Sequence, residues 1–292
     1  MCSGIVGQPS ALPGAARVKG VDCHAHVMRL DVPLAPGRHS APARDVSAEE
    51  FISLLDEHQL SHGILTQPSF YGSDNSILLG ALAQYPDRLC GTAIVDEDIT
   101  EDALHKLRQA GIVGVRLNWI RRPSLPDISS RGFQVFMGRV AAAGLHIEIY
   151  LEGPLLASVL PCLRTSGALI VVDHFGAPDP AQRLACAGFH AVLDGVASGQ
   201  VIVKLSAPYR LGGVDPKPYV DALLAEGGAQ QLVWASDWPW VSFEKGQSYS
   251  ACLAALESWV PDAALRQTIL AESPLKIMRL ANQFLKPVDN LT

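Results

Sequence analysis

Eight short apolar runs alternate with helix-like segments along most of the chain, and this alternation limits the possible folds more than any other feature. Each run is rich in β-branched and other apolar residues. The runs are 20–26, 62–67, 89–95, 113–117, 146–151, 169–173, 201–205 and 232–235. Strands without a polar face are typical of parallel sheets that are covered on both sides.

The segments between these runs have helical periodicity. The clearest begins at Ser47, where Glu50 follows three residues later ahead of Phe51, as in a capping box. Further helices are predicted over 75–85, 101–109, 131–143, 154–163, 180–197, 216–226 and 247–259. Strands that are each followed by a helix favour an α/β fold of the (β/α)8 TIM-barrel type over the alternative, a doubly wound open sheet. Two later patterns, 261–271 and 274–284, predict extra C-terminal helices outside the barrel.

Length and composition favour one large domain. The chain has 292 residues, of which 48% are hydrophobic and 18% charged, and no linker-like segment divides it. We therefore expect one barrel over residues 19–292. Residues 1–18 are predicted to form a flexible N-terminal tail.

Charge and cysteine content exclude several classes of protein. The formal net charge is -6 and no basic stripe is present, so nucleic acid is not an expected partner. No apolar run approaches the roughly 20 residues of a membrane span. The N-terminal residues do not resemble a signal peptide. Six widely spaced cysteines without a CxxC pair argue against a disulfide framework or a thiolate zinc site. A cytoplasmic location is therefore expected.

Polar residues stand at the ends of the predicted strands, which is where barrel enzymes place their chemistry. His24 and His26 are two residues apart on the first run, so their side chains are expected to point to the same side. His174 follows the sixth run and Asp237 follows the eighth. We expect these four side chains to converge on one point.

Two modes of chemistry are compatible with this set. Three neutral imidazoles and a carboxylate, His24, His26, His174 and Asp237, can ligate one zinc or another divalent ion that activates water. Without a metal, the imidazoles can donate hydrogen bonds to a substrate carbonyl while Asp237 acts as general base.

Five segments, in order, carry a resemblance to a known family: VDCHAHV, TQPSFYGSDN, GVRLNWIRR, VVDHFGAPD and ASDWPW. Together they resemble the amidohydrolase superfamily, and more narrowly its branch of 2-pyrone-4,6-dicarboxylate lactonases and related sugar-lactone and muconolactone hydrolases. The resemblance extends from about Val21 to the last helices. Members of this branch work with one zinc or without a metal.

The resemblance implies roles for individual residues. Asp237 would activate water, and His24, His26 and His174 would surround the scissile carbonyl oxygen or a metal. Three arginines would hold substrate carboxylates, for which a guanidinium is well suited. The substrate-binding residues expected in this way are Ser69, Arg116, Arg122, Tyr150 and Arg210. Trp240 is also expected at the substrate, as part of a hydrophobic wall over it. Arg116 also stands out without the resemblance, since it interrupts an apolar strand and a buried guanidinium needs an anionic partner.

The chain also departs from the family pattern. Ala177 stands where these lactonases have arginine, Trp240 where they have histidine, and an aromatic residue is replaced near Ser40. We therefore expect a small carboxylated lactone related to, and less charged than, pyrone dicarboxylate. The alternatives are a metal-dependent decarboxylase of an aromatic or unsaturated acid, a lactone isomerase, and a barrel that binds a small acid without catalysis.

The other histidines are interpreted as structural. His39, His58, His62, His105 and His190 lie in predicted loops, helices or strand starts. His146 begins its strand and is expected at the opposite face of the barrel from the active site.

Overall fold

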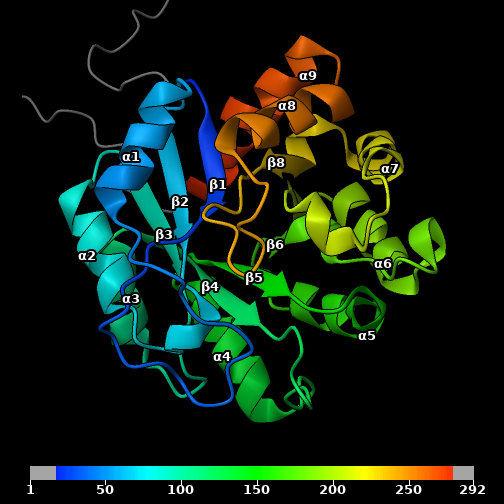
Figure 1. Cartoon of the computed structure of the whole chain (residues 1–292). Coiled ribbons are helices and arrows are strands. Elements are labelled where there is room, and N and C mark those ends of the chain that lie inside the picture. The colour runs from blue at the N-terminus through cyan, green and yellow to red at the C-terminus, as the bar shows by residue number, and fades with distance from the viewer. Residues whose placement is uncertain (1–17, 279–292) are drawn as a thin grey trace, which may run out of the picture.

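The predicted barrel is confirmed by a computed structural model, which describes residues 18–278 (Figure 1). Eight parallel strands pair in the order β1 to β8. Their bounds are β1 Val21–Ala25, β2 His62–Thr66, β3 Leu89–Ala93, β4 Ile112–Asn118, β5 His146–Tyr150, β6 Ile170–Val172, β7 Val201–Leu205 and β8 Leu232–Trp234. The predicted tail, except residue 18, and the end of the predicted helix 274–284 lie outside the described residues.

Helices connect successive strands and surround the barrel (Figure 1). They are α1 Ala48–Glu57, α2 Ser76–Gln84, α3 Glu101–Gln109, α4 Arg131–Ala142, α5 Gly153–Arg164, α6 Ala187–Ala197, α7 Lys217–Gly227 and α8 Tyr249–Trp259. The predicted cap of α1 is present, because the Ser47 hydroxyl accepts a hydrogen bond from the Glu50 backbone N–H at 3.2 Å. The Glu50 carboxylate pairs with Arg44.

The predicted helix over 180–197 is wrong in its first part. Within this predicted segment the α-helix is limited to α6, and a short 3-10 turn, η3 Arg183–Ala185, precedes it. Arg183 has a φ of 52°, a left-handed conformation that interrupts a helix. After α8, the expected extra helices occur as α9 Ala263–Gln267, a π-helical turn η6 Thr268–Glu272, and α10 Pro274–Met278.

The barrel closes where the ends of β1 and β8 meet. The His26 N–H donates to the Trp238 carbonyl at 2.9 Å, and the Asp237 N–H donates to the His24 carbonyl at 3.0 Å. Below this contact, the buried Asp22 carboxylate accepts hydrogen bonds from the Ser236 hydroxyl at 2.5 Å and from the Tyr249 hydroxyl of α8 at 2.8 Å. We call this contact between the first and last strands the seam.

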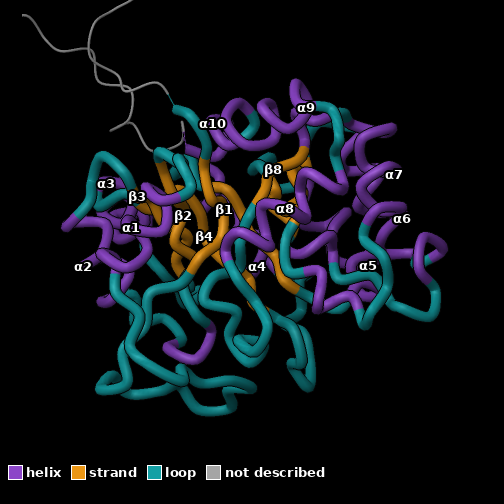
Figure 2. The backbone as a smooth tube through the Cα atoms, turned by 45° about the horizontal axis from the view of Figure 1, so that its top comes forward, coloured by secondary structure: helices purple, strands orange, loops and turns teal. Residues whose placement is uncertain are grey.

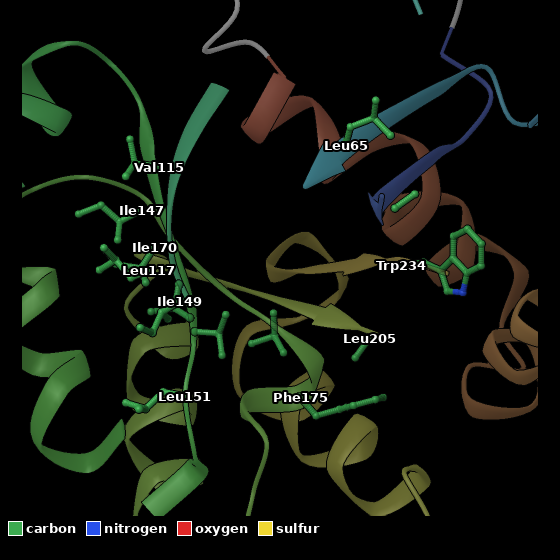
Figure 3. Packing of buried hydrophobic residues seen from close by; sticks show 14 of the residues in the cluster. Leu65, Val115, Leu117, Ile147, Ile149, Leu151, Ile170, Phe175, Leu205 and Trp234 are labelled. Atoms are coloured by element: carbon green, nitrogen blue, oxygen red, sulfur yellow. The ribbon is translucent and has the colours of Figure 1, made fainter. Parts of the chain in front are cut away.

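Apolar side chains fill the space between the sheet and the helices. In Figure 3, Val115, Leu117, Ile147, Ile149 and Ile170 extend from neighbouring strands into this layer. A second, smaller apolar cluster occupies one end of the barrel interior. It includes Val171, Ile202 and Val233 from the strands and Ile277 and Met278 from α10. The α10 helix therefore covers the end of the barrel at which the strands begin.

Polar side chains occupy the barrel interior beyond this second apolar cluster, which we call the apolar plug. Asp173, just beyond β6, and Lys204 on β7 follow Val171 and Ile202 by two residues and lie on the same inward side. The interior thus changes from apolar to charged along the strands, and long loops gather at one end of the barrel in Figure 2. Among residues 18–278, none of the helices has both the length and the apolar character that crossing a bilayer demands.

Candidate active site

An irregularity in β1 directs both histidines of the His-x-His pair inward. The pairing of β1 with β2 shifts register between Asp22 and Ala25. As a result Cys23 joins the apolar plug, whereas His24 and His26 both contact Asp237, which lies just beyond β8.

The four residues predicted to be catalytic converge as expected. The Oδ1 atom of Asp237 lies 3.5 Å from the Nε2 atom of His24, 3.7 Å from that of His26 and 3.8 Å from that of His174. The Nε2 atoms of His24 and His26 are 3.3 Å apart. Their placement is therefore correct, while their catalytic roles remain a prediction.

Two of these residues have strained backbones at the strand ends. His174 has a φ of 48° and Asp237 a φ of 57°, although neither is glycine. Left-handed non-glycine residues are costly and concentrate at functional sites. Here the conformation turns each side chain over the end of the barrel, and Ser206 holds His174 through a 2.8 Å contact with Nδ1.

Asp237 is a buried carboxylate that is kept ionised by its neighbours. Its Oδ2 atom accepts hydrogen bonds from the Tyr209 hydroxyl at 2.6 Å and from Arg210, at 3.0 Å from Nε and 2.9 Å from Nη2. Burial raises the pKa of Asp237, but the Arg210 guanidinium and the nearby imidazoles outweigh it and hold that pKa well below its usual range. Asp237 can therefore accept a proton at neutral pH.

His24 and His174 are neutral imidazoles in this environment. Burial, with the Lys204 ammonium as a further cause, lowers the pKa of His24 to about 4. Burial also lowers the pKa of His174 to about 3, against the attraction of Asp237. Both rings can therefore serve as neutral donors or acceptors of hydrogen bonds.

A network of four buried charges lies beneath the histidines. Arg116 on β4 pairs with Glu148 on β5 at 3.1 Å and with Asp173 at 2.9 Å. Lys204 on β7 pairs with the same two carboxylates, at 2.6 Å and 3.0 Å. Although burial raises the pKa of Asp173, Lys204 and the other neighbours hold it well below its usual range. Two cations and two anions thus balance one another inside the barrel.

Arg116 therefore has anionic partners within its own chain. From the sequence, its guanidinium is expected to bind a substrate carboxylate, because a buried cation needs a partner. The roles of Glu148 and Lys204, which complete the charge balance, were not predicted. Both could have been found by the same reasoning, since each interrupts an apolar strand, in HIEIY and VIVKL.

Two adjoining cavities open above the four residues that are predicted to be catalytic. The inner cavity, of about 250 Å³, is lined by His26, His174 and Asp237 among others. The outer cavity has a volume of about 620 Å³. The residues that line both are His39, Ser69, Arg116, Asn118, Ile120 and Arg121. A ligand over Asp237 would therefore meet this shared boundary.

The predicted substrate-binding residues are distributed unevenly over these cavities. Ser69 lines both, Tyr150 and Arg210 line the inner one, and Arg122 lines the outer one. Trp240 lines neither: its φ is 62° and its indole N–H donates to the Ser236 carbonyl at 3.1 Å, which holds it against the seam.

His39 and Arg121 lie at the boundary of the cavities, a position that the sequence did not indicate. From the sequence, His39 is expected to be structural, and Arg121 is not among the predicted site residues. Arg121 has a φ of 58°, and its N–H donates to Glu152 at 2.7 Å, so the loop turns sharply at this residue. Neither feature could be inferred from composition or spacing.

The four central side chains have the spacing of a metal site but not its hydrogen-bond pattern. Separations of 3.3 to 3.8 Å among their facing atoms are close to the roughly 3.4 Å edge of a zinc tetrahedron. However, the Nδ1 atom of His24 lies 3.0 Å from Nζ of Lys204. An ammonium can only donate, so neutral His24 carries its proton on Nε2 and has no lone pair there for a metal. A four-ligand metal centre does not fit these residues.

A second group of possible metal ligands, His24, Glu148 and Asp173, lies deeper in the barrel. Lys204 and Arg116 already neutralise both carboxylates there. The charge balance of this group is therefore complete without a metal ion.

Comparison with known proteins confirms the resemblance. The family model for amidohydrolases matches residues 21–280. A 2-pyrone-4,6-dicarboxylate hydrolase from Comamonas testosteroni is 27% identical over 274 residues, covering 88% of this chain and 89% of the relative. A 4-sulfomuconolactone hydrolase from Rhizobium radiobacter is 25% identical over 266 residues, covering 88% of each chain.

A solved structure is similar over the same span. It is that of a probable 2-pyrone-4,6-dicarboxylic acid hydrolase from Acinetobacter baumannii with citric acid bound, 32% identical, with a TM-score of 0.85 over 89% of this chain and 99% of that one. The sequence match, the barrel and the convergence of the strand-end residues lead to one conclusion. The chain belongs to the amidohydrolase family.

Proposed function

We propose that this protein is a lactonase, which hydrolyses the cyclic ester of a small carboxylated lactone. The observation that carries the proposal is the position of Asp237, whose free Oδ1 atom faces three histidines at the floor of the inner cavity. The relatives named as hydrolases of a pyrone and of a muconolactone derivative support the same reaction class.

Asp237 acts as the general base. It is ionised at neutral pH and takes a proton from a water molecule as the water oxygen attacks the lactone carbonyl carbon. The ring C–O bond then breaks, and the proton passes from Asp237 to the leaving ring oxygen. Lactone and water thus give a hydroxy acid, which releases one proton at neutral pH.

The imidazoles stabilise the charge that develops on the carbonyl oxygen. His24 and His174 are buried and neutral, so an N–H from either can donate to the oxyanion without the cost of moving a charge from solvent. Both rings are fixed before substrate arrives, His174 by Ser206 and His24 by Lys204. Preorganised donors of this kind favour the transition state over the ground state.

The boundary between the cavities is the proposed binding site for the substrate carboxylate. Arg121 and His39 line it on the solvent side, and Ser69 supplies a hydroxyl. Guanidinium groups bind carboxylates in a bidentate manner. The related Acinetobacter protein holds citric acid, itself a small polycarboxylate.

We place the protein in the cytoplasm. The five cysteines of the described region, Cys23, Cys90, Cys162, Cys186 and Cys252, are all free thiols. Burial raises the pKa of Cys90 to about 12, which keeps this thiol unreactive. Reduced thiols of this kind are typical of a reducing compartment.

The test is a continuous assay of proton release with a panel of pyrone carboxylates and muconolactones, combined with detection of the ring-opened acid. We expect one proton per ring opened, and loss of turnover in Asp237→Asn. Carbon dioxide release from a carboxylated substrate without ring opening would identify a decarboxylase instead. Ring rearrangement without proton release would identify an isomerase, and tight binding without any turnover would identify a non-catalytic barrel.

A further inference from the structure

A lysine lies fully buried beneath the histidines, where the proposed reaction does not use it. The Lys204 side chain is 1% exposed. Its Nζ atom lies 2.6 Å from Glu148, 3.0 Å from Asp173 and 3.0 Å from Nδ1 of His24. An ammonium group has three N–H donors and no acceptor, so these three contacts use it completely. In the contact with His24, Lys204 must therefore be the donor and the histidine nitrogen the acceptor.

The direction of the hydrogen bond at His26, the other histidine of the pair, is also fixed. The Nδ1 atom of His26 lies 2.7 Å from the Thr66 carbonyl oxygen, which can only accept. The neutral form of His26 therefore carries its proton on Nδ1 and has a lone pair at Nε2. That lone pair lies 3.3 Å from Nε2 of His24, which carries the other proton. All three hydrogen bonds therefore run in one direction, from Lys204 through His24 and His26 to Thr66.

We propose that Lys204 is a positioning residue that fixes the tautomers of this pair, so that His24 is a donor and His26 an acceptor at the active site. The tautomers stand independently of the proposed function, and their roles in catalysis rest on it. When substrate binds, the His24 N–H would exchange its hydrogen bond to His26 for one to the substrate carbonyl oxygen. The lone pair released in this way, on the His26 Nε2 atom 3.7 Å from Oδ1 of Asp237, would accept a hydrogen bond from the attacking water.

The opposite tautomer is the one that a metal site would need. His24 would then donate from Nδ1 to Asp173, whose Oδ1 atom lies 3.3 Å away, and would offer its Nε2 lone pair to a metal. In that arrangement an N–H of His24 would face an N–H of Lys204 across 3.0 Å. Lys204 thus favours the hydrogen-bonding mode of the site over the metal-ligating mode.

The wild-type protein provides the first test, which needs neither substrate nor substitution. Long-range ¹H–¹⁵N correlation spectra at mildly alkaline pH distinguish the two neutral tautomers of each imidazole. Signals are assigned by their loss in His24→Gln and His26→Gln. We expect the Nε2–H form for His24 and the Nδ1–H form for His26. The Nδ1–H form at His24 would overturn the proposal.

The second test removes the ammonium. In Lys204→Met we expect His24 to change to the Nδ1–H form, and zinc chloride to bind about 10–100-fold more tightly than to wild type in isothermal titration. The double variant Lys204→Met/Glu148→Gln also neutralises one of the two carboxylates that pair with Lys204, which leaves Arg116 balanced by Asp173, and it serves if the single variant does not fold. Lys217→Met, which removes an exposed lysine paired with Asp221 on α7, should leave both readouts unchanged.

An unchanged tautomer and unchanged zinc affinity in the folded Lys204 variants would refute the positioning role. Neither measurement depends on turnover. If no lactone is hydrolysed while His24 and His26 show opposite tautomers, the proposed function fails and the inference about Lys204 stands. If lactones are hydrolysed and the tautomers are the reverse, the inference fails alone.

Discussion

Arg210 binds Asp237 through two guanidinium nitrogens, Nε at 3.0 Å and Nη2 at 2.9 Å, and both reach the same carboxylate oxygen, Oδ2. The other oxygen, Oδ1, is left to face the histidines. One atom of the carboxylate is thus anchored, and the other is available to take a proton from water.

Replacement of Asp237 by asparagine should remove the base while keeping the shape of the side chain. We expect kcat/KM for a hydrolysed lactone to fall by roughly 10²–10⁴-fold, the usual contribution of a positioned general base. Asp221→Asn, an exposed carboxylate on α7, is the control and should retain full activity. A variant at Asp237 with more than a tenth of wild-type activity would exclude this residue as the base.

Tyr209→Phe should change the pH dependence of the reaction. The phenol donates to Oδ2 of Asp237 at 2.6 Å and so stabilises the carboxylate. Its loss raises the pKa of Asp237, so the acidic limb of the kcat/KM profile should move to higher pH. Tyr219→Phe is a matched control, because the hydroxyl of this buried tyrosine has no hydrogen-bond partner among the described residues. Identical acidic limbs for Tyr209→Phe and wild type would contradict the prediction.

Substitutions of Arg116 and of Arg121 should have different effects. The first should lower stability, and the second should weaken substrate binding. Arg116→Met leaves two buried carboxylates with only Lys204, so the free energy of unfolding should fall by about 3 kcal/mol or more. Arg121→Met removes an exposed side chain at the cavity boundary. It should raise KM for a carboxylated lactone by about tenfold and leave stability unchanged. Urea unfolding and steady-state kinetics on both variants check this, and the reverse pattern would show that Arg116 is the substrate ligand.

Lowering the pH should destabilise the protein already at pH values well above the range in which carboxylates titrate. The pKa of His24 is lowered to about 4 and that of His174 to about 3, from 6.5 when unfolded. Between these values the unfolded chain binds more protons, so stability is complete above pH 6.5 and falls as the pH falls. The lowered pKa of Asp237 acts in the same direction only below about pH 4.

The loss between pH 7 and 5 should be on the order of a few kcal/mol, measured as the free energy of unfolding in urea. His174→Asn should flatten this dependence. His105→Asn, on the exposed face of α3, should not. Equal slopes for His174→Asn and wild type would show that the buried ring does not contribute.

The barrel could be predicted from the sequence, because apolar runs without a polar face alternate with segments of helical periodicity. The sequence also indicated His24, His26, His174 and Asp237, since residues at strand ends of a barrel must meet at one rim. It was not sufficient for the charge pairs. A single buried ion such as Arg116 can be recognised in a strand, but its partner depends on the register between strands, as in the pairing of Arg116 with Glu148.

The positions of loop residues also could not be predicted from the sequence. His39 and Arg121 reach the cavities because of the path of two long connections. Trp240 turns away because of a left-handed backbone and a hydrogen bond to Ser236. Neither path has a periodicity from which it could be predicted.

The seam has a consequence for how activity arises during folding. One of the two backbone hydrogen bonds of the seam, from the Asp237 N–H to the His24 carbonyl, also sets the proposed base against the proposed oxyanion donor. A chain with seven strands in place still has an open sheet and no base beside its histidines. Catalysis would therefore begin only when the final strand docks, and turnover would report completion of the barrel more directly than any spectroscopic signal of secondary structure.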